Sequence, residues 1–124
     1  MKKIAVIGLG YVGLPLGLNF ARAGAKVIGL DIDQEKVKAL NAGQSYIKHI
    51  SEGDVAETVA KGRFKASTDF SLIQSEAVDA VIICVPTPLT KQREPDISFI
   101  LDTGREVAPY LQRGMVVVLE STTF

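Results

Sequence analysis

Cysteine and histidine are scarce in this sequence, and their scarcity excludes two kinds of chemistry. The 124 residues include one cysteine, Cys84, so the chain cannot form an internal disulfide. They also include one histidine, His49, which gives no basis for a metal cluster or a Ser-His-Asp triad. We expect Cys84, in the apolar run VIICV, to be a small buried hydrophobic residue, and His49 to lie at a surface or between domains.

Net charge and long apolar runs are also missing. Lys and Arg total 14, as do Asp and Glu, so the formal net charge is zero. Proteins that bind nucleic acids or anionic membranes usually carry a basic excess, and we therefore expect no nucleic acid and no membrane as partners. No apolar stretch approaches the roughly 20 residues that cross a bilayer, and the N-terminal run IAVI is too short for a signal peptide. The unpaired cysteine suits a reducing compartment, which predicts a soluble, cytoplasmic protein.

The sequence does contain an alternation of strand and helix patterns, with 47% hydrophobic residues to supply a core. Strands are predicted at residues 3–7, 26–30, 63–66, 77–85 and 115–119. Helices are predicted at residues 11–23, from an Asp33 cap to about residue 42, at 54–60, briefly after Asp69, and at 97–108 after Asp96. Continuous apolar strands alternating with helices indicate a parallel sheet covered on both faces. We predict a Rossmann-type doubly wound α/β fold with three α/β/α layers.

Three glycines in the stretch GLGYVG follow the first predicted strand and open the first predicted helix. In such a G-x-G-x-x-G turn, Gly8 permits the tight turn, Gly10 lets a pyrophosphate approach the backbone, and Gly13 brings helix and sheet close together. The phosphates would then lie at a helix N-terminus, where the dipole favours negative charge. The alternative is a close-packed turn that binds no ligand.

Asp31 ends the second predicted strand, 18 residues after Gly13. A carboxylate at about this spacing accepts hydrogen bonds from the adenosine ribose hydroxyls of a dinucleotide and repels a 2′-phosphate, which favours NAD over NADP. Lys36 follows about one helical turn beyond and could reach the same ribose. The alternatives are a surface aspartate at a strand end and a solvated lysine.

Two further segments leave predicted strands at the sheet edge where open α/β folds bind their ligands. The first contains Val85, Pro86 and Thr87, with the Thr87 hydroxyl directed toward the cofactor. The second contains Ser121 and Thr122, whose hydroxyls could face the nicotinamide end. A rigid turn and an ordinary strand exit are the respective alternatives.

These motifs occur with several others in one order along the whole chain: GLGYVGLPL at 8–16, Asp31, STD at 67–69, VPTPL at 85–89, REPD at 93–96 and ESTT at 120–123. With this set the chain resembles the N-terminal NAD-binding domain of the UDP-glucose/GDP-mannose dehydrogenase family. The stretch YIKHI at 46–50, together with VPTPL and REPD, is most similar to the branch that oxidises UDP-N-acetylglucosamine or UDP-N-acetylmannosamine at C6.

The resemblance implies an activity and a set of cofactor contacts. The family oxidises the sugar's C6 alcohol to a carboxylate by two successive hydride transfers to NAD, with a cysteine capturing the intermediate aldehyde as a thioester that is then hydrolysed. By position, Tyr11 and Val12 would lie at the diphosphate, Asp31 and Lys36 at the adenosine ribose, and Thr87 near the cofactor. Thr122 matches a threonine that touches the cofactor and helps to hold a catalytic water.

The resemblance also implies what these residues lack. The family's catalytic cysteine, lysine and aspartate, its central dimerisation helix and its second domain all lie downstream of residue 124, and Cys84 does not match the catalytic cysteine. The last predicted strand runs into ESTTF without a polar tail, which is typical of a domain cut from a longer protein; a natural small protein is the alternative.

We therefore expect residues 1–124 to be one NAD-binding domain that binds NAD but does not oxidise a UDP-sugar alone. The full-length enzyme would use the UDP-sugar as substrate and form a homodimer or larger assembly. Two other functions fit the same fold. One is a stand-alone NAD-responsive regulatory module, and the other is a different dehydrogenase, such as a 3-hydroxyacyl-CoA or 6-phosphogluconate type.

Overall fold

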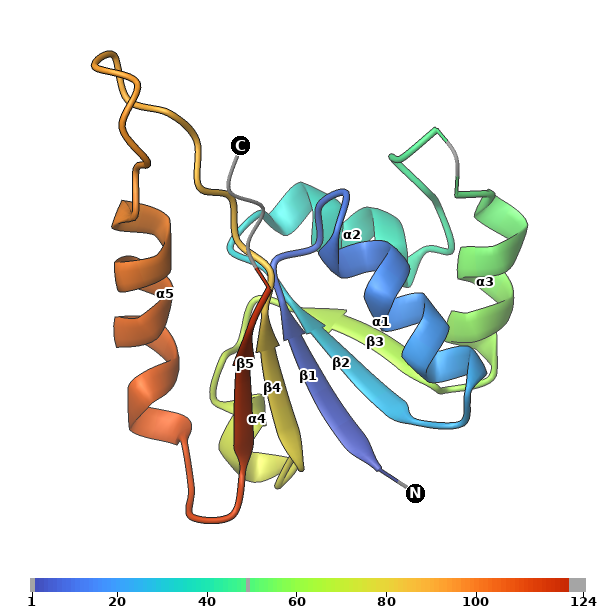
Figure 1. Cartoon of the computed structure of the whole chain (residues 1–124). Coiled ribbons are helices and arrows are strands. Elements are labelled where there is room, and N and C mark those ends of the chain that lie inside the picture. Colours follow the sequence, from blue (N-terminus) through green and yellow to red (C-terminus); the bar gives the residue numbers. More distant parts are fainter. Residues whose placement is uncertain (1, 49, 121–124) are drawn as a thin grey trace.

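A five-stranded parallel sheet forms the centre of the molecule in the computed structural model, which describes residues 2–48 and 50–120 (Figure 1). The strands are β1 (Lys3–Ile7), β2 (Lys26–Leu30), β3 (Phe64–Ser67), β4 (Ala80–Ile83) and β5 (Val116–Leu119). Their order is β3-β2-β1-β4-β5, and every neighbouring pair is parallel. This order confirms the predicted doubly wound Rossmann-type sheet.

Helices cover both faces of the sheet (Figure 1). They are α1 (Gly13–Arg22), α2 (Gln34–Asn41), α3 (Glu52–Ala60), α4 (Leu72–Ser75) and α5 (Ser98–Val107), followed by the 3₁₀ turn η1 (Ala108–Tyr110). Helices α1, α2 and α3 pack on one face, while α4 and the end of α5 pack on the other. The predicted three layers are present, although most of α5 stands beside β5 and contributes only Val107 to the buried core.

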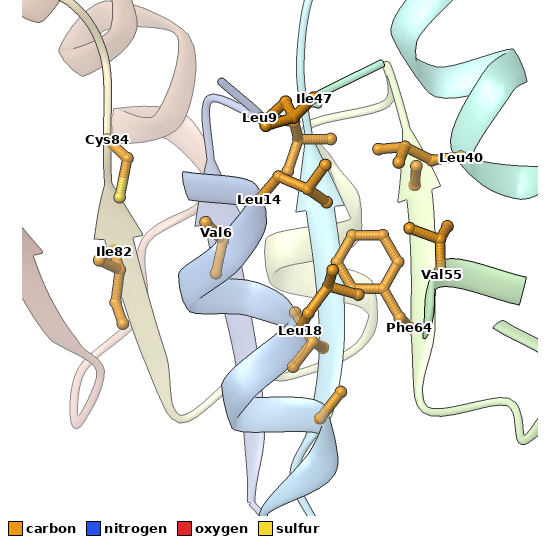
Figure 2. Close-up of a cluster of buried hydrophobic side chains, with 13 residues drawn as sticks. Val6, Leu9, Leu14, Leu18, Leu40, Ile47, Val55, Phe64, Ile82 and Cys84 are labelled. Carbon is orange, nitrogen blue, oxygen red and sulfur yellow. The ribbon is translucent and has the colours of Figure 1, made fainter. Parts of the chain in front are cut away.

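Side chains alternate between the two faces of the sheet along each strand, so the core consists of two clusters, one on each face. In β1, the side chain of Val6 joins the cluster under α1, whereas Ala5 and Ile7 join the cluster under α4. Figure 2 shows the first cluster, in which Leu18 and Phe64 fill the space between α1 and the sheet. The apolar residues on both sides of each central strand are thereby buried, as expected for a parallel sheet.

Three helix starts test the predicted caps. The predicted cap at Asp96 is wrong, because α5 begins at Ser98 with Ile97 as its N-cap residue and without a side-chain capping hydrogen bond, while Asp96 accepts the Ser98 N–H at 3.0 Å from outside the helix. The Asp33 carboxylate accepts the N–H groups of Glu35 and Lys36 at 3.0 and 3.3 Å, which confirms it as the cap of α2. The predicted cap at Asp69 is wrong, because α4 begins two residues later than that cap requires, with Ser71 as its N-cap residue. Asp69 instead accepts the backbone N–H and the hydroxyl of Ser71, forming a local turn before the helix.

Several predicted boundaries also shift by one to three residues, and two of these shifts have a local cause. Helix α3 begins at Glu52 rather than residue 54, because the Ser51 hydroxyl accepts the Asp54 N–H and starts the helix earlier. The fourth strand was predicted at residues 77–85 but forms only from Ala80 to Ile83. At its start Ala77 has a φ of 49°, a left-handed turn conformation that cannot continue a strand.

The two edges of the sheet differ. At the β3 edge, the Asn41 side chain donates to the Ala66 carbonyl at 2.9 Å and accepts the Ala66 N–H at 3.0 Å. This amide occupies the hydrogen-bonding position that a neighbouring strand would take. At the β5 edge all four residues are apolar and exposed, with Val116 at 59% and Val118 at 36%.

Candidate functional site

A cleft of about 530 Å³ lies at the carboxyl ends of β1, β2 and β4, where the strand order reverses. Open α/β sheets bind ligands at this switch point, and the volume falls within the range of ~300–1,000 Å³ that is usual for ligand pockets. Most of the residues predicted to bind a cofactor line this cleft: Gly8, Gly10, Tyr11, Val12, Asp31, Lys36, Val85 and Pro86.

The remaining predicted residues are placed differently. Gly13 lies behind the cleft, at the start of α1. Thr87 is 6% exposed and is not among the described residues that line the cleft, so its side chain is buried rather than at the surface. Ser121 and Thr122 lie outside the described residues, as does His49.

The three glycines of the turn have three different surroundings. Gly8 has a φ of +94°, and a Cβ there would lie 2.5 Å from the Cys84 carbonyl oxygen. A Cβ at Gly13 would lie 1.7 Å from the Gly8 carbonyl oxygen, so these two positions bring loop, helix and β4 together. At Gly10, by contrast, a Cβ would meet no described atom within 4 Å. Packing therefore explains Gly8 and Gly13, whereas the open space at Gly10 is what the close approach of a ligand requires.

The N-terminus of α1 faces the cleft beside this turn. Its N-cap residue, Val12, makes no side-chain capping hydrogen bond, and the first turn contains no acidic residue. An uncapped helix start with no carboxylate nearby leaves a partial positive charge available for an anion. The geometry therefore suits a phosphate group on the cleft side of Gly10 and Val12.

The carboxylate of Asp31 is fixed in the cleft by two backbone hydrogen bonds. Oδ2 accepts the Leu9 N–H at 2.8 Å, and Oδ1 accepts the Asp33 N–H at 2.9 Å. Each oxygen retains a second lone pair, so both can also accept a hydroxyl group of a ligand. The position at the end of β2 matches the requirement for a ribose-binding carboxylate.

Charged and aromatic groups surround this carboxylate. Asp33 and Lys36 line the same cleft, and the Lys36 ammonium lies 5.7 Å from the centre of the Tyr46 ring, within the range of a cation–π contact. Burial raises the pKa of the Tyr46 phenol, and the carboxylates of Asp31 and Asp33 raise it further. The phenol therefore stays protonated, and a hydrogen-bond donor, at neutral pH.

Cys84 lies at the end of β4 against the glycine turn, and its environment makes it a poor nucleophile. Its side chain is buried, as predicted. Burial raises the pKa of the Cys84 thiol to about 11, and the Glu120 carboxylate adds to the effect. Since the thiolate is the reactive form, Cys84 is chemically quiet at neutral pH.

Several residues of the site were not predicted. Leu9, between two of the glycines, bonds to Asp31 through its N–H and to the Tyr46 hydroxyl through its carbonyl. Phe99 and Thr103 of α5 form the far wall of the cleft. The apolar pattern of α5 signalled a helix but not its position, and nothing in the local sequence connects Tyr46 with residues 37 positions earlier.

The described residues contain neither a membrane-spanning helix nor a metal-binding cluster. None of the helices is long and apolar enough to cross a membrane. No group of three or more His, Cys, Asp or Glu side chains in residues 2–48 and 50–120 could hold a metal ion.

Comparison with known proteins shows that the chain matches one family. The model of the NAD binding domain of the UDP-glucose/GDP-mannose dehydrogenase family matches residues 2–124. Similar curated proteins include the NDP-N-acetyl-D-galactosaminuronic acid dehydrogenase of Ralstonia nicotianae, 41% identical over 126 residues, and the UDP-N-acetyl-D-mannosamine dehydrogenase of Escherichia coli, 40% identical over 121 residues. The matches cover 98% and 97% of this chain but only 28% of each relative.

A solved structure supports the same relationship. The UDP-D-ManNAc dehydrogenase of Pyrococcus horikoshii superimposes with a TM-score of 0.90 at 36% sequence identity, over 98% of this chain and 28% of that one. The chain thus spans little more than a quarter of the length of the relatives it matches.

Proposed function

Because this chain belongs to the UDP-glucose/GDP-mannose dehydrogenase family, through its NAD binding domain, we propose that it is the cofactor-binding part of an NAD-dependent nucleotide-sugar 6-dehydrogenase. One observation carries the proposal for the site itself: the open space at Gly10 lies in the same cleft as the Asp31 carboxylate. A phosphate-approach point and a ribose acceptor in one cleft are what a dinucleotide requires.

The residues of the cleft have distinct tasks in this proposal. Gly10 and the start of α1, with Tyr11 and Val12, receive the diphosphate. Asp31 accepts the adenosine ribose hydroxyls, with Lys36 beside it, and the negative charge of Asp31 and Asp33 disfavours a 2′-phosphate. Val85 and Pro86 line the cleft after β4, and Thr87, which follows them in the same loop, is the proposed hydroxyl contact of the cofactor. Ser121 and Thr122, outside the described residues, are the proposed contacts of the nicotinamide end. When bound, NAD supplies the group that accepts hydride from the sugar's C6.

The substrate proposal is a UDP-N-acetylhexosamine. It is supported by two relatives, a UDP-N-acetyl-D-mannosamine dehydrogenase and an NDP-N-acetyl-D-galactosaminuronic acid dehydrogenase. We propose that the sugar site, the catalytic cysteine and the dimer contacts belong to further polypeptide, so residues 1–124 bind NAD without turning over a nucleotide sugar. A cytoplasmic location fits, because the single cysteine is stable there as a free thiol.

A titration with NADH and, separately, NADPH tests the cofactor assignment, using nucleotide fluorescence as the signal. We expect saturable NADH binding and weaker NADPH binding. The Asp31→Ala variant should lose roughly 10-fold or more in NADH affinity, because charged hydrogen bonds contribute about 1.5–3 kcal/mol each. It should lose less for NADPH, since the same carboxylate repels the 2′-phosphate.

Asp79→Ala is the matched control. Asp79 also accepts a backbone N–H, from Lys3 at 2.9 Å, but it lies directly before β4, at the amino ends of the strands and away from the cleft. NADH affinity should be unchanged in this variant. Equal losses in both variants, or no NADH binding by a folded wild-type chain, would overturn the assignment of the cleft.

Turnover is tested by incubating the chain with NAD and UDP-N-acetylmannosamine or UDP-N-acetylglucosamine and following NADH absorbance. We expect no NADH above the rate without sugar. Sugar-dependent NADH formation would show that these residues contain a complete active site, contrary to the proposal.

A further inference from the structure

Tyr46 lies in the irregular segment between α2 and α3, and its hydroxyl reaches the glycine turn. The phenol O–H donates to the carbonyl oxygen of Leu9, 37 residues earlier in the chain. Tyr46 is not among the described residues that line the cleft, so its hydroxyl reaches the turn without being part of the cleft wall. The predicted cofactor contacts do not account for this residue.

The backbone of Leu9 is held on both sides of its Cα. Its N–H donates to Asp31 at 2.8 Å, and its carbonyl accepts from Tyr46. Its side chain is fully buried in the core cluster together with Ile47, the residue after Tyr46, and Figure 2 shows these two side chains at the top of the cluster. Leu9 therefore has little freedom to rotate, and its orientation depends on the segment that carries Tyr46.

The orientation of Leu9 determines the orientation of the next amide. The described residues contain no cis peptide bond, so the Leu9 carbonyl and the Gly10 N–H point in opposite directions. With the carbonyl turned toward Tyr46, which does not line the cleft, the Gly10 N–H is turned away from Tyr46, and Gly10 itself lines the cleft. Gly10 is also the position where an added Cβ would meet open space.

We propose that Tyr46 is a positioning residue for dinucleotide binding: its hydrogen bond to the Leu9 carbonyl holds the Leu9–Gly10 peptide so that the Gly10 N–H faces the phosphates. This inference rests on the proposed function, because it requires a diphosphate at Gly10. Tyr46 acts through Leu9 and does not touch the ligand. Burial keeps the phenol protonated, so the donor persists across neutral and mildly alkaline pH.

Local contacts hold Tyr46 in place. The Ser45 hydroxyl donates to the Ile47 carbonyl at 3.0 Å and accepts the Ile47 N–H at 3.3 Å, which closes a turn around Tyr46. Lys36 lies over the ring, 5.7 Å from its centre. The ring therefore connects a side chain of the ribose end of the cleft with the phosphate turn.

The Tyr46→Phe variant tests the proposal, because it removes only the hydroxyl. Kd values for NADH and ADP-ribose, which contain the diphosphate, are compared with that of adenosine, which lacks it and is followed by NMR. NADH and ADP-ribose should bind roughly 3- to 10-fold more weakly, as the loss of one hydrogen bond predicts. Adenosine affinity should not change, and the Gly10 amide resonance should shift in the unliganded variant.

Tyr110→Phe is the matched control, since Tyr110 belongs to η1 on the opposite face of the sheet. It should leave all three Kd values at their wild-type level. A purely structural role for Tyr46 would lower the melting temperature and leave the ratio of NADH to adenosine affinity unchanged, which overturns the proposal. If wild type binds NADH and Tyr46→Phe binds it equally well, the proposal for Tyr46 fails while the proposed function stands. If wild type does not bind NADH, the proposed function fails as well.

Discussion

An alanine substitution at Gly10 should weaken NADH binding without lowering stability, whereas one at Gly8 should lower stability, although both residues belong to one turn. A Cβ at Gly10 would meet no described atom within 4 Å. The Gly10→Ala variant should therefore be as stable as wild type, or more stable by up to about 1 kcal/mol through reduced freedom of the unfolded chain. Its methyl group would occupy the space that a diphosphate needs, and NADH affinity should fall by at least 10-fold, about 1.4 kcal/mol.

At Gly8 an added side chain would destabilise the folded chain. A left-handed conformation costs a residue with a Cβ about 1–2 kcal/mol, and φ at Gly8 is +94°. The added Cβ would also lie 2.5 Å from the Cys84 carbonyl oxygen, and overpacking of this kind costs about 1–3 kcal/mol. The Gly8→Ala variant should lose about 2–5 kcal/mol of the free energy of unfolding, which is a large part of the ~5–15 kcal/mol of a typical domain.

The assay combines urea unfolding, followed by circular dichroism, with NADH titration under conditions where each variant is folded. At about 3–6 °C per kcal/mol for a chain of this size, the two melting temperatures should also separate clearly. The reasoning is refuted if Gly10→Ala binds NADH as wild type does, because the phosphates then do not approach Gly10. It is equally refuted if Gly8→Ala is as stable as wild type.

Three further predictions concern the rest of the molecule. Asn41→Ala removes both hydrogen bonds to Ala66 and should lower the free energy of unfolding by about 1–3 kcal/mol in urea denaturation; an unchanged midpoint would mean that water replaces the amide without cost. Cys84 should react with iodoacetamide about 100-fold more slowly than a thiol of ordinary pKa at pH 8, because its pKa is about 11. The stabilising effect of the buried neutral Cys84 thiol is complete below about pH 9 and is lost as the pH rises through 11. An alkylation rate that levels off near pH 9 would contradict the assigned burial of this thiol. Leu18→Ala should cost about 2–5 kcal/mol by leaving a cavity beside Phe64, and NADH affinity of the folded variant should stay unchanged because Leu18 is not among the described residues that line the cleft.

Most of the sheet could be predicted from the sequence because its strands are short, apolar and buried on both sides. Val6 and Ile7 face opposite layers, and both must be hydrophobic, which produces a continuous apolar run. The position of α5 could not be predicted. Phe99 and Leu101 give that helix an apolar pattern, yet both are largely exposed, at 44% and 50%, because the helix stands beside the sheet rather than on it.

The candidate site was predictable where local geometry dictates the residue type. Gly8 and Gly13 have no room for a side chain, and Asp31 stands where β2 ends, so spacing alone identifies them. The contact of Tyr46 with Leu9 was not predictable, because it joins segments 37 residues apart across the surface of the turn. An aromatic residue in an irregular segment carries no pattern that would indicate its partner.

The difference between the two sheet edges affects how the molecule can aggregate. An exposed edge strand is a template for pairing with another chain. At β3, the Asn41 amide already occupies the N–H and carbonyl of Ala66, so an incoming strand would have to displace it. At β5, Val116 to Leu119 form an uncharged β-branched and apolar segment with no such protection among the described residues. If this chain forms intermolecular sheets, growth should therefore begin at β5 and proceed from one side only.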